Sequence, residues 1–448
     1  MYAYSAEDIV ALATAPGIGA LAIVRLSGTD LSSIYREFSK KNAIDRKAVF
    51  SKIYHPQTKK LLDEAIITYF KGPNSFTGED VIEISCHGGN VVPRSIILAA
   101  IDCGARNANP GEFTCRAFLN GKINILKAEA IATLIASGSQ NGADLSLQHI
   151  LGRVSSIFSE IKEEAKDFLS IIENELNFSE DELCYTSYID FNKRAIDIKS
   201  KLVLILKSST FGKEIMSGFR IVILGKPNSG KSSLFNALIG FDRAIVSKIP
   251  GTTRDSIESY FDINGFSVCL IDTAGIWESD NFLDKLSVQK TKDLLKQANL
   301  YLLLDEKDPS KVLKSHFSKI INEKCILVKS KSDKNNNSLK NDIGVLSVSS
   351  VNGQGLSELL THISTYIKNN VNNNSMIDAA LITRRQRNLL ECSIGFINDV
   401  IYQIDNCIET DILASTLRGF ISSIKEVIGE IPNKDILKHI FSNFCIGK

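Results

Sequence analysis

The stretch Gly225-Lys226-Pro227-Asn228-Ser229-Gly230-Lys231-Ser232 fills every position of the pattern GxxxxGK[ST]. The largely apolar run 220–224 before it is typical of a buried strand, and residues 233–239 after it have the pattern of a helix that ends at Gly240. A glycine loop between a strand and a helix places backbone N–H groups around phosphate oxygens. The stretch therefore predicts a phosphate-binding loop, because a turn without a ligand does not require every position of the pattern.

Composition limits the class of protein. The chain has 448 residues, of which 44% are hydrophobic and 23% charged, and its formal net charge is +1. This length predicts about three domains at roughly 150 residues each. The nine cysteines form no CxxC pair, which favours reduced thiols in a cytoplasmic compartment. The N-terminus does not resemble a signal peptide and no apolar run approaches the roughly 20 residues that cross a bilayer, so we expect a soluble cytoplasmic protein.

The spacing of apolar residues changes along the chain. Up to about residue 121, strand patterns alternate with turns, which predicts an α+β domain. Residues 147–176 and 189–206 have helical periodicity, as do three segments after residue 382. Between these helical parts, strand and helix patterns alternate from about 219 to 367, which predicts a mostly parallel sheet with helices on both faces.

The fold class that follows is a multidomain α/β and α protein, in which an α/β domain is inserted into a helical domain that follows an α+β domain. The predicted domains are 1–121, the discontinuous 122–217 with 376–448, and 218–375. The expected strands are 9–14, 19–26, 66–70, 81–86, 221–224, 268–271, 300–304, 325–328 and 345–348. A polar linker is expected at 369–375, and the last helices at 383–407, 412–428 and 434–444.

Two further phosphate motifs follow the loop. Asp272-Thr273-Ala274-Gly275 forms a DxxG motif after a predicted strand, where the carboxylate can hold a Mg²⁺-bound water. Between the two motifs lies Gly251-Thr252-Thr253-Arg254-Asp255, and Thr253 can ligate Mg²⁺ together with the Ser232 hydroxyl. Lys231 reaches the terminal phosphates. Three such motifs in this order predict a nucleoside triphosphatase.

The box that selects the base departs from the usual pattern. GTPases place Asn-Lys-x-Asp after a later strand, whereas this chain has Ser330-Lys331-Ser332-Asp333. The Asp333 carboxylate can accept hydrogen bonds from the guanine N1 and N2 donors, and Ser330 keeps a hydroxyl but lacks the amide. We expect guanine specificity that rests mainly on Asp333, with lowered affinity. Residues 349–351 lie where a further base-contacting loop is expected.

With these motifs the chain resembles the MnmE (TrmE) family of tRNA-modifying GTPases over nearly its whole length, which implies a Ras-like P-loop domain. The segments that carry the resemblance are 13–17, 25–28, 73–80, 110–113, 116–122, 251–255 and the terminal Phe444-Cys445-Ile446-Gly447-Lys448. The resemblance implies a K⁺-dependent GTPase that modifies carbon 5 of the wobble uridine of certain tRNAs with an aminomethyl or carboxymethylaminomethyl group. It also implies an MnmG-family FAD protein as partner, with which a heterotetramer is expected, and a homodimer formed through the N-terminal domain.

The resemblance implies that the N-terminal domain binds a tetrahydrofolate one-carbon derivative, in the 5-formyl or 5,10-methylene form. Arg25, Glu83, Lys122 and Lys448 match the folate-contacting positions. A pterin offers donors to a carboxylate such as Glu83, and its glutamate tail requires cations. Cys445 would lie beside the folate, although a cysteine near a terminus is also a common small apolar filler, and both interpretations stay open.

The resemblance also implies the nucleotide and metal ligands. The GTP-binding positions are Asn228, Ser229, Gly230, Lys231, Ser232, Ser233, Ser247, Lys248, Ile249, Pro250, Gly251, Thr252, Thr253, Asp272, Thr273, Ala274, Gly275, Ser330, Lys331 and Asp333. Ser232 and Thr253 would ligate Mg²⁺. K⁺ would be held by Asn228, Ser247, Ile249 and Thr252, and would neutralise the phosphate charge that an arginine finger neutralises elsewhere. Arg254 is an alternative finger, although its place next to Thr253 favours a structural ion pair.

Lys231, Thr253 and Asp284 are the expected catalytic residues, and Asp284 is a departure from the family. It stands where the family has a water-orienting glutamate, so the carboxylate is kept but lies more than about 1 Å further back, a displacement that can cost about 10²-fold in rate. Slow hydrolysis is expected unless Glu278 substitutes.

Two other functions remain open from the sequence. A regulatory GTP switch in ribosome assembly or stress signalling would need the nucleotide motifs alone, and the N-terminal motifs and residues 444–448 argue against it. An ATPase is disfavoured by Asp333.

Overall fold

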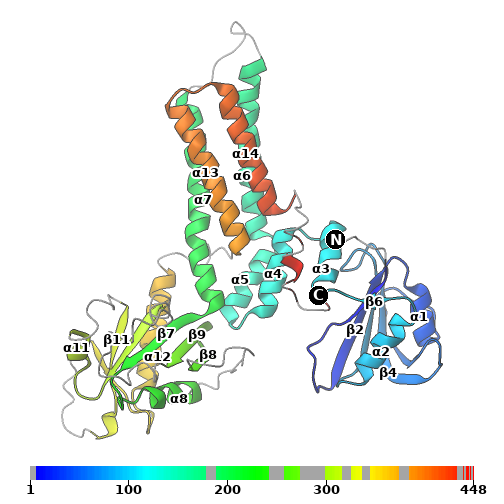
Figure 1. The fold of residues 1–448 in the computed structure, drawn as a ribbon, viewed down its shortest axis with the longest axis horizontal. Coiled ribbons are helices and arrows are strands. Elements are labelled where there is room, and N and C mark those ends of the chain that lie inside the picture. The colour runs from blue at the N-terminus through cyan, green and yellow to red at the C-terminus, as the bar shows by residue number, and fades with distance from the viewer. Residues whose placement is uncertain are drawn as a thin grey trace. The chain divides into compact units, whose positions relative to one another are not determined.

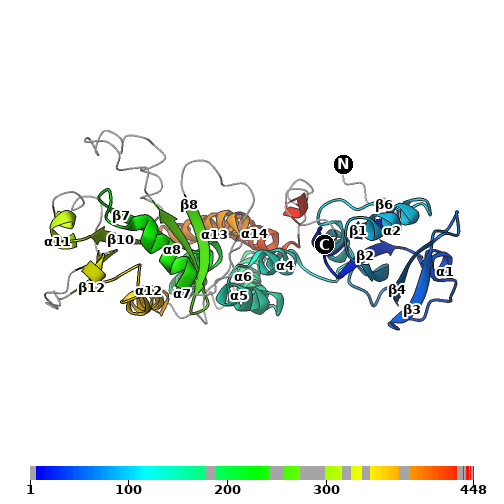
Figure 2. The same ribbon diagram turned by 90° about the horizontal axis from the view of Figure 1, so that it is seen from below.

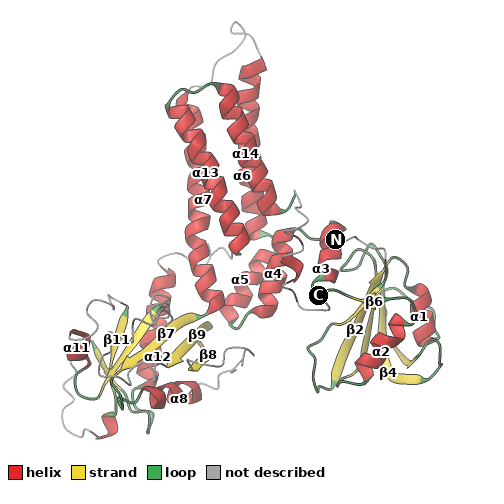
Figure 3. Cartoon of the chain, in the orientation of Figure 1, coloured by secondary structure: helices red, strands yellow, loops and turns green. Residues whose placement is uncertain are grey.

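The structure is a computed structural model that describes residues 7–177, 188–241, 257–272, 298–314, 324–334, 344–372 and 383–430, with 437, 440–442, 444 and 447. The chain divides into two compact units, each built from separate stretches of sequence. Unit 1 comprises Met1–Ala132, His149–Ile198 and Cys392–Lys448, and unit 2 comprises Thr133–Gln148 and Lys199–Glu391. Figure 1 traces the chain, and Figure 3 shows that sheets and helices are largely segregated along it.

A six-stranded sheet forms the N-terminal part of unit 1. Its strands are β1 (Ile9–Leu12), β2 (Leu21–Gly28), β3 (Val49–Tyr54), β4 (Leu61–Phe70), β5 (Asp80–His87) and β6 (Arg106–Asn107). They lie in the order β3-β4-β5-β2-β1-β6, and every pair is antiparallel except β1 with β6. The helices α1 (Ser32–Ser39) and α2 (Val92–Ile101) pack on this sheet (Figure 2). The predicted α+β domain is thus present.

The alternation of side chains decides which face carries polar groups. Val24 of β2 and Ile84 of β5 are fully buried with Phe38 of α1 and Ile96 of α2 in the core between sheet and helices. Because successive residues of a strand point to opposite faces, the residues beside them, among them Arg25, point to the other face.

Helical segments from before and after the inserted segment pack together in unit 1. The helices in order are α3 (Glu112–Leu119), α4 (Ile125–Ala136), α5 (Gln140–Ile150), α6 (Arg153–Asn177), α7 (Tyr188–Ser217), α13 (Arg384–Asp405) and α14 (Thr410–Ile428). Most of α5 belongs to unit 2, and α4, α7 and α13 cross the boundary between the units. Phe168 of α6 lies 5.5 Å from Phe191 of α7 between ring centroids, Ser393 of α13 shares a 2.7 Å hydrogen bond with Ser423 of α14, and α6 contacts α14. Figure 1 shows these four helices side by side.

The helix bounds differ from the prediction in four places. The single helix expected over 147–176 is two helices, α5 and α6, because the chain turns at Gly152, whose φ is +94°. Helix α7 continues well past residue 206 to Ser217, and residues 369–372 of the expected linker belong to the end of α12 (Leu356–Asn372). Gly240 lies inside α8 (Lys231–Phe241) rather than beyond it. Of the expected last helix, residues 437 and 440–442 are helical among those described.

Unit 2 holds a second six-stranded sheet. Its strands are β7 (Phe219–Gly225), β8 (Ile257–Ile263), β9 (Phe266–Asp272), β10 (Leu300–Asp305), β11 (Cys325–Lys329) and β12 (Val345–Ser347). The order is β12-β11-β10-β7-β9-β8, with every pair parallel except β8 with β9. Ile221 and Ile223 are buried with α8 and α12 on one face, whereas Val222 and Leu224 are buried with Val312 of α11 (Pro309–Val312) on the other. The expected mostly parallel sheet covered on both faces is confirmed.

Strand β8 was not among the expected strands. It pairs with β9 through a hairpin whose turn residues Asn264 and Gly265 have φ of +52° and +87°. Asn-Gly between two β patterns is a strong hairpin signal, because both turn positions need positive φ, so the sequence did contain the information. Among the described residues, no helix is long and apolar enough to cross a membrane.

Candidate functional site

The glycine loop between β7 and α8 leaves no room for a side chain at Gly225. Gly225 has a φ of +157°, and a Cβ added there would lie 2.5 Å from the Leu304 carbonyl oxygen and 2.6 Å from the Ser229 Oγ. Asn228 and Gly230 also have positive φ, at +62° and +90°. The pattern identified in the sequence therefore corresponds to a strand-to-helix loop of the expected kind, at the edge of the sheet where α/β proteins bind ligands.

The Lys231 side chain is buried and hydrogen-bonded within this loop. Its Nζ donates to the carbonyl oxygens of Gly225 and Lys226, both at 3.0 Å, and the residue is 6% exposed. Burial lowers the pKa of Lys231, and the nearby charge of Asp272 opposes that shift. An ammonium group whose hydrogen-bond partners in the described part of the chain are carbonyl oxygens is suited to a phosphate anion.

Ser232 and Asp272 meet where parallel neighbours β7 and β9 end. The Ser232 Oγ donates to one carboxylate oxygen of Asp272 at 2.7 Å, and Asp272 is 5% exposed. Among the described residues, the second Asp272 oxygen and the Ser229 Oγ have no hydrogen-bond partner although both are buried. Hard oxygen ligands of this kind fit Mg²⁺ bound through a hydroxyl and through carboxylate-held water, so the donor set agrees with the predicted metal.

The base-selecting box lies after β11. Asp333, in the short 3-10 helix η3 (Ser332–Lys334), accepts a 2.7 Å hydrogen bond from the buried Ser349 Oγ, which places the predicted further loop beside it. Lys331 has a φ of +57° and pairs with Glu306 at 2.9 Å. Ser330 is 6% exposed, and its Oγ has no partner among the described residues.

The remaining nucleotide positions divide into two groups. Asn228 is exposed at the tip of the glycine loop, and Ser233 is exposed in the first turn of α8. The predicted residues that lie outside the described part of the chain are Ser247, Lys248, Ile249, Pro250, Gly251, Thr252, Thr253, Thr273, Ala274, Gly275 and Asp284, together with Arg254 and Glu278.

Three of the four predicted folate residues line one pocket on the sheet of unit 1. Arg25 and Glu83 are directly opposed on β2 and β5, and their side chains form an ion pair at 2.7 Å. Lys122 lines the same pocket, of about 370 Å³, and donates to the Pro73 carbonyl oxygen at 2.9 Å. Lys448 and Cys445 lie outside the described residues, yet Arg25 also donates to the carbonyl oxygen of the neighbouring Gly447 at 3.1 Å. Segments far apart in the sequence thus meet at Arg25.

Further residues of this pocket were not predicted. Arg46, Phe70 and Phe76 also line it, and the Arg46 guanidinium lies 5.9 Å from the Phe70 ring centroid. An aromatic ring with cations around it suits a flat ligand that has an anionic tail. Arg46 and Phe70 follow no motif, and Phe76 belongs to the segment 73–80 that carries the family resemblance, so it is the folded chain that brings all three to one pocket.

Arg116 explains why two of the segments that resemble the family are linked. It is 3% exposed and pairs with Glu79 at 2.8 Å and with Glu112 at 3.1 Å. Asn120, at the end of the same segment, donates to the Thr77 carbonyl oxygen at 2.7 Å. The loop 73–80, which borders the pocket, is therefore fixed by the segment 116–122.

Comparisons with known proteins cover nearly the whole chain. Residues 8–122 match the model of the GTP-binding protein TrmE N-terminus, and residues 125–445 match the model of the MnmE helical domain. Proteins described as tRNA modification GTPase MnmE from Alkaliphilus oremlandii, Cytophaga hutchinsonii and Thermotoga maritima are 33%, 34% and 34% identical to it. Each alignment spans 99% of this chain and 100%, 98% and 100% of the respective relative. This chain therefore belongs to the MnmE family of tRNA modification GTPases.

Proposed function

We propose that this protein is a K⁺-dependent GTPase that acts in the cytoplasm with an MnmG-type FAD partner. Together they modify carbon 5 of the wobble uridine of certain tRNAs and use a tetrahydrofolate derivative as the one-carbon donor. The observation that carries the proposal is the presence, in one chain of this family, of a phosphate loop with a Ser232–Asp272 pair and of a pocket with an Arg25–Glu83 pair.

The nucleotide part of the proposal assigns a role to each buried polar group. Lys231 would exchange its carbonyl partners for phosphate oxygens, which supply the charge that those carbonyls lack. Mg²⁺, when bound, neutralises charge on the β- and γ-phosphates. Ser232 and Asp272 would orient the metal, and Asp333 would accept from guanine while Ser349 holds one of its oxygens.

The potassium part of the proposal rests on Asn228. It is exposed at the loop tip, where its backbone is in the left-handed region with a φ of +62°. K⁺, when bound, supplies a positive charge near the β- and γ-phosphates, as an arginine finger does in other GTPases. Ser247, Ile249 and Thr252 would complete the ligands, and homodimerisation would enclose them.

The folate part of the proposal uses the pocket of unit 1. Glu83 would accept hydrogen bonds from the pterin, and Arg25, Lys122 and Lys448 would face the carboxylates of the glutamate tail. The folate supplies the one-carbon unit. Arg25 is kept in place by Glu83 and by the Gly447 carbonyl, so the C-terminal segment would help to form the site.

A regulatory GTP switch without substrate chemistry is the second candidate. Only the nucleotide motifs favour it, because such a switch has no use for the cationic and aromatic pocket of unit 1. An ATPase would leave the Asp333 carboxylate opposite a base without the N1 and N2 donors of guanine.

The deciding experiment measures GTP turnover in KCl and in NaCl, each with and without an MnmG-type partner. We expect faster hydrolysis in KCl by about 10-fold or more, because a bound monovalent cation stabilises charge in the transition state. Formation of modified tRNA should require the partner and the folate. Equal turnover in both salts would remove the cation mechanism, and tRNA modification that proceeds without folate would remove the donor assignment.

Asp284 offers a second test of the catalytic assignment. Replacement of Asp284 by glutamate restores the methylene that the family has, so kcat should rise, by up to about 10²-fold. Steady-state phosphate release in KCl measures this directly. An unchanged or lower kcat for Asp284→Glu would show that another group orients the water.

A further inference from the structure

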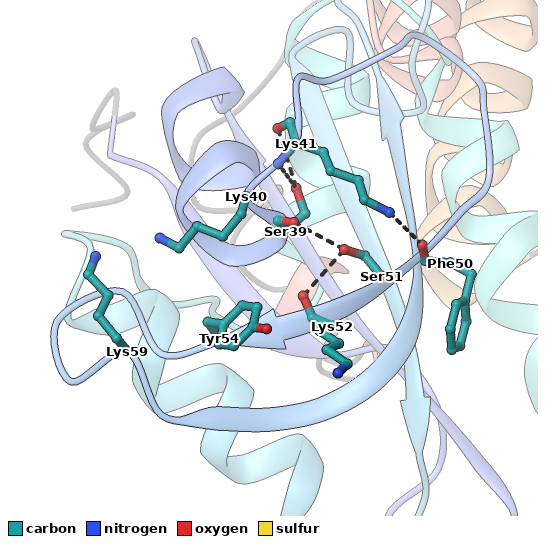
Figure 4. Close-up of a pocket in the computed structure, with 8 residues that line it drawn as sticks. All are labelled: Ser39, Lys40, Lys41, Phe50, Ser51, Lys52, Tyr54 and Lys59. Atoms are coloured by element: carbon teal, nitrogen blue, oxygen red, sulfur yellow. Dashed lines mark hydrogen bonds between the residues drawn. The ribbon is translucent and has the colours of Figure 1, made fainter.

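A second pocket in unit 1 shares no lining residue with the folate pocket. Its volume is about 550 Å³, and it lies between the end of α1, the edge strand β3 and the turn that leads to β4 (Figure 4). Four lysines, two aromatic residues and two serines line it, namely Ser39, Lys40, Lys41, Phe50, Ser51, Lys52, Tyr54 and Lys59. None of these residues has a role in the proposed nucleotide or folate chemistry.

The lysines outnumber the carboxylates that pair with them. Lys40 and Lys59 both lie 3.0 Å from the same Glu37 carboxylate oxygen, so two ammonium groups share one acid. Lys52 is 3.9 Å from Glu64, at the outer limit of an ion pair. Figure 4 shows the Lys40 and Lys59 side chains extending on the same side of the pocket.

Lys41 adds a fourth cation, and it forms no ion pair with a carboxylate among the residues that the structure describes. Its Nζ donates to the Phe50 backbone carbonyl at 2.8 Å, which keeps an ammonium group beside the edge strand. Together the pocket carries four positive charges against two carboxylates that contact its lysines. A net positive pocket on an exposed edge attracts a polyanion.

Aromatic and basic residues are interleaved along β3. Phe50 and Lys52 are two residues apart on the strand, and Tyr54 lines the same pocket after a register shift between Ile53 and Tyr54. Phe50 is 64% exposed, although burying a phenylalanine is favourable. Exposed rings between cations are the arrangement with which proteins bind single-stranded nucleic acid, because bases stack on the rings while cations follow the phosphates.

We propose that this pocket binds the sugar–phosphate backbone of the tRNA substrate. Lys40, Lys52 and Lys59 contact phosphates, and a base or ribose packs on Phe50. The identity of the nucleic acid as tRNA rests on the function proposed above, whereas the charge and the exposed ring are properties of the pocket itself. Flexible lysines suit phosphates because they act as point charges that need no fixed pairing geometry.

The test measures tRNA binding by the full-length protein as a function of salt. Unmodified tRNA carrying a wobble uridine is titrated by fluorescence anisotropy at several KCl concentrations, with wild type and with Lys40→Gln/Lys52→Gln/Lys59→Gln. Each lost phosphate contact lowers the slope of log K against log salt by about 0.7 to 0.9, so the slope should fall by about 2 to 3. Affinity at about 0.1 M KCl should fall by roughly 10-fold or more.

The matched control removes the same charge elsewhere. Lys166, Lys193 and Lys207 lie on the exposed surfaces of α6 and α7, and their triple replacement by glutamine should leave the salt slope at the wild-type value. Phe50→Ala is a second, independent variant. It should weaken binding by about 5- to 100-fold while the salt slope is unchanged, because it removes stacking but no charge.

The outcomes separate this inference from the proposed function. If wild type binds and modifies tRNA while the pocket variants bind with wild-type affinity and slope, the inference is overturned and the function stands. If wild type alone binds no tRNA at any salt but still supports tRNA modification with the partner, the inference is overturned and the function stands; if modification also fails with the partner and folate present, the function is contradicted as well. A third outcome uses poly-γ-glutamate as the ligand. If it binds wild type and binds the triple variant more weakly, while the triple variant binds tRNA as tightly as wild type does, the pocket serves an acidic tail and the inference is wrong.

Discussion

Ser330 is the residue at which the base site departs from other GTPases. Its Oγ is buried without a partner among the described residues, and its Cβ lies 3.9 Å from the position of a Cβ built on Gly230. An asparagine amide at this position can therefore reach the phosphate loop and join it to the base site. Ser330→Asn should tighten GTP and GDP binding by about 5- to 10-fold, the effect of one hydrogen bond of about 1 kcal/mol. Titration with a fluorescent guanine nucleotide measures it.

The control for this prediction is Ser330→Ala. This variant adds no amide, so it should not tighten nucleotide binding; it only removes a buried hydroxyl that has no partner among the described residues. A large loss in Ser330→Ala, or weaker binding in Ser330→Asn, would show that the serine itself contacts the nucleotide or the loop.

At the scale of elements, the start of α3 is fixed by ion pairs that should make stability depend on pH. Burial alone would raise the pKa of Glu112, but hydrogen bonds from Arg106, the Asn109 N–H and Arg116 outweigh it and lower that pKa to about 2. The unfolded value is near 4.5. Because the folded pKa is the lower one, the stabilisation is complete above about pH 4.5 and is lost as the pH falls toward 2.

Glu112→Gln tests this linkage. The variant should be less stable at pH 7, by up to about 3 kcal/mol, and the difference from wild type should shrink steadily from pH 4.5 to pH 2. Urea unfolding followed at several pH values gives both quantities. The exposed Glu64→Gln should show neither effect. A difference from wild type that is the same at pH 3 and pH 7 would assign the loss to packing instead of charge.

How far the elements could be predicted from the sequence depended on whether local signals agreed with tertiary ones. The central inserted strands β7, β9 and β10 were clear because each is an apolar run that is buried on both faces. The break between α5 and α6 at Gly152 could not be predicted from the sequence, because the apolar spacing continues across it. Only the backbone shows the turn. At Gly240 the sequence predicted a helix end where there is none, since a glycine that usually ends a helix is here tolerated inside one.

The same limit applies to the candidate sites. The glycine loop and Asp272 were found because phosphate chemistry fixes residue types at fixed spacings. Arg46 and Phe70 come from a loop and a strand without a spacing rule, and they reach one pocket only through the fold of the sheet. Lys40 and Lys59 likewise share Glu37 only because α1 packs beside β3 and the turn that follows it.

At the scale of the whole molecule, the two candidate sites are built from different units. Arg25, Glu83 and Lys122 belong to unit 1, whereas the phosphate loop belongs to unit 2. Lys231→Ala should therefore abolish GTP hydrolysis while the Kd for 5-formyltetrahydrofolate stays within about 2-fold of wild type, because no folate contact is lost. Glu83→Gln should leave GTP hydrolysis unchanged and weaken folate binding by about 10- to 100-fold, because charged hydrogen bonds of about 1.5 to 3 kcal/mol are lost. Isothermal titration with folate and phosphate-release assays measure the two sites separately, and both variants should fail to modify tRNA. Folate affinity that falls in Lys231→Ala would mean that the nucleotide site contributes to folate binding even without GTP, and the division of labour between the units would have to be abandoned.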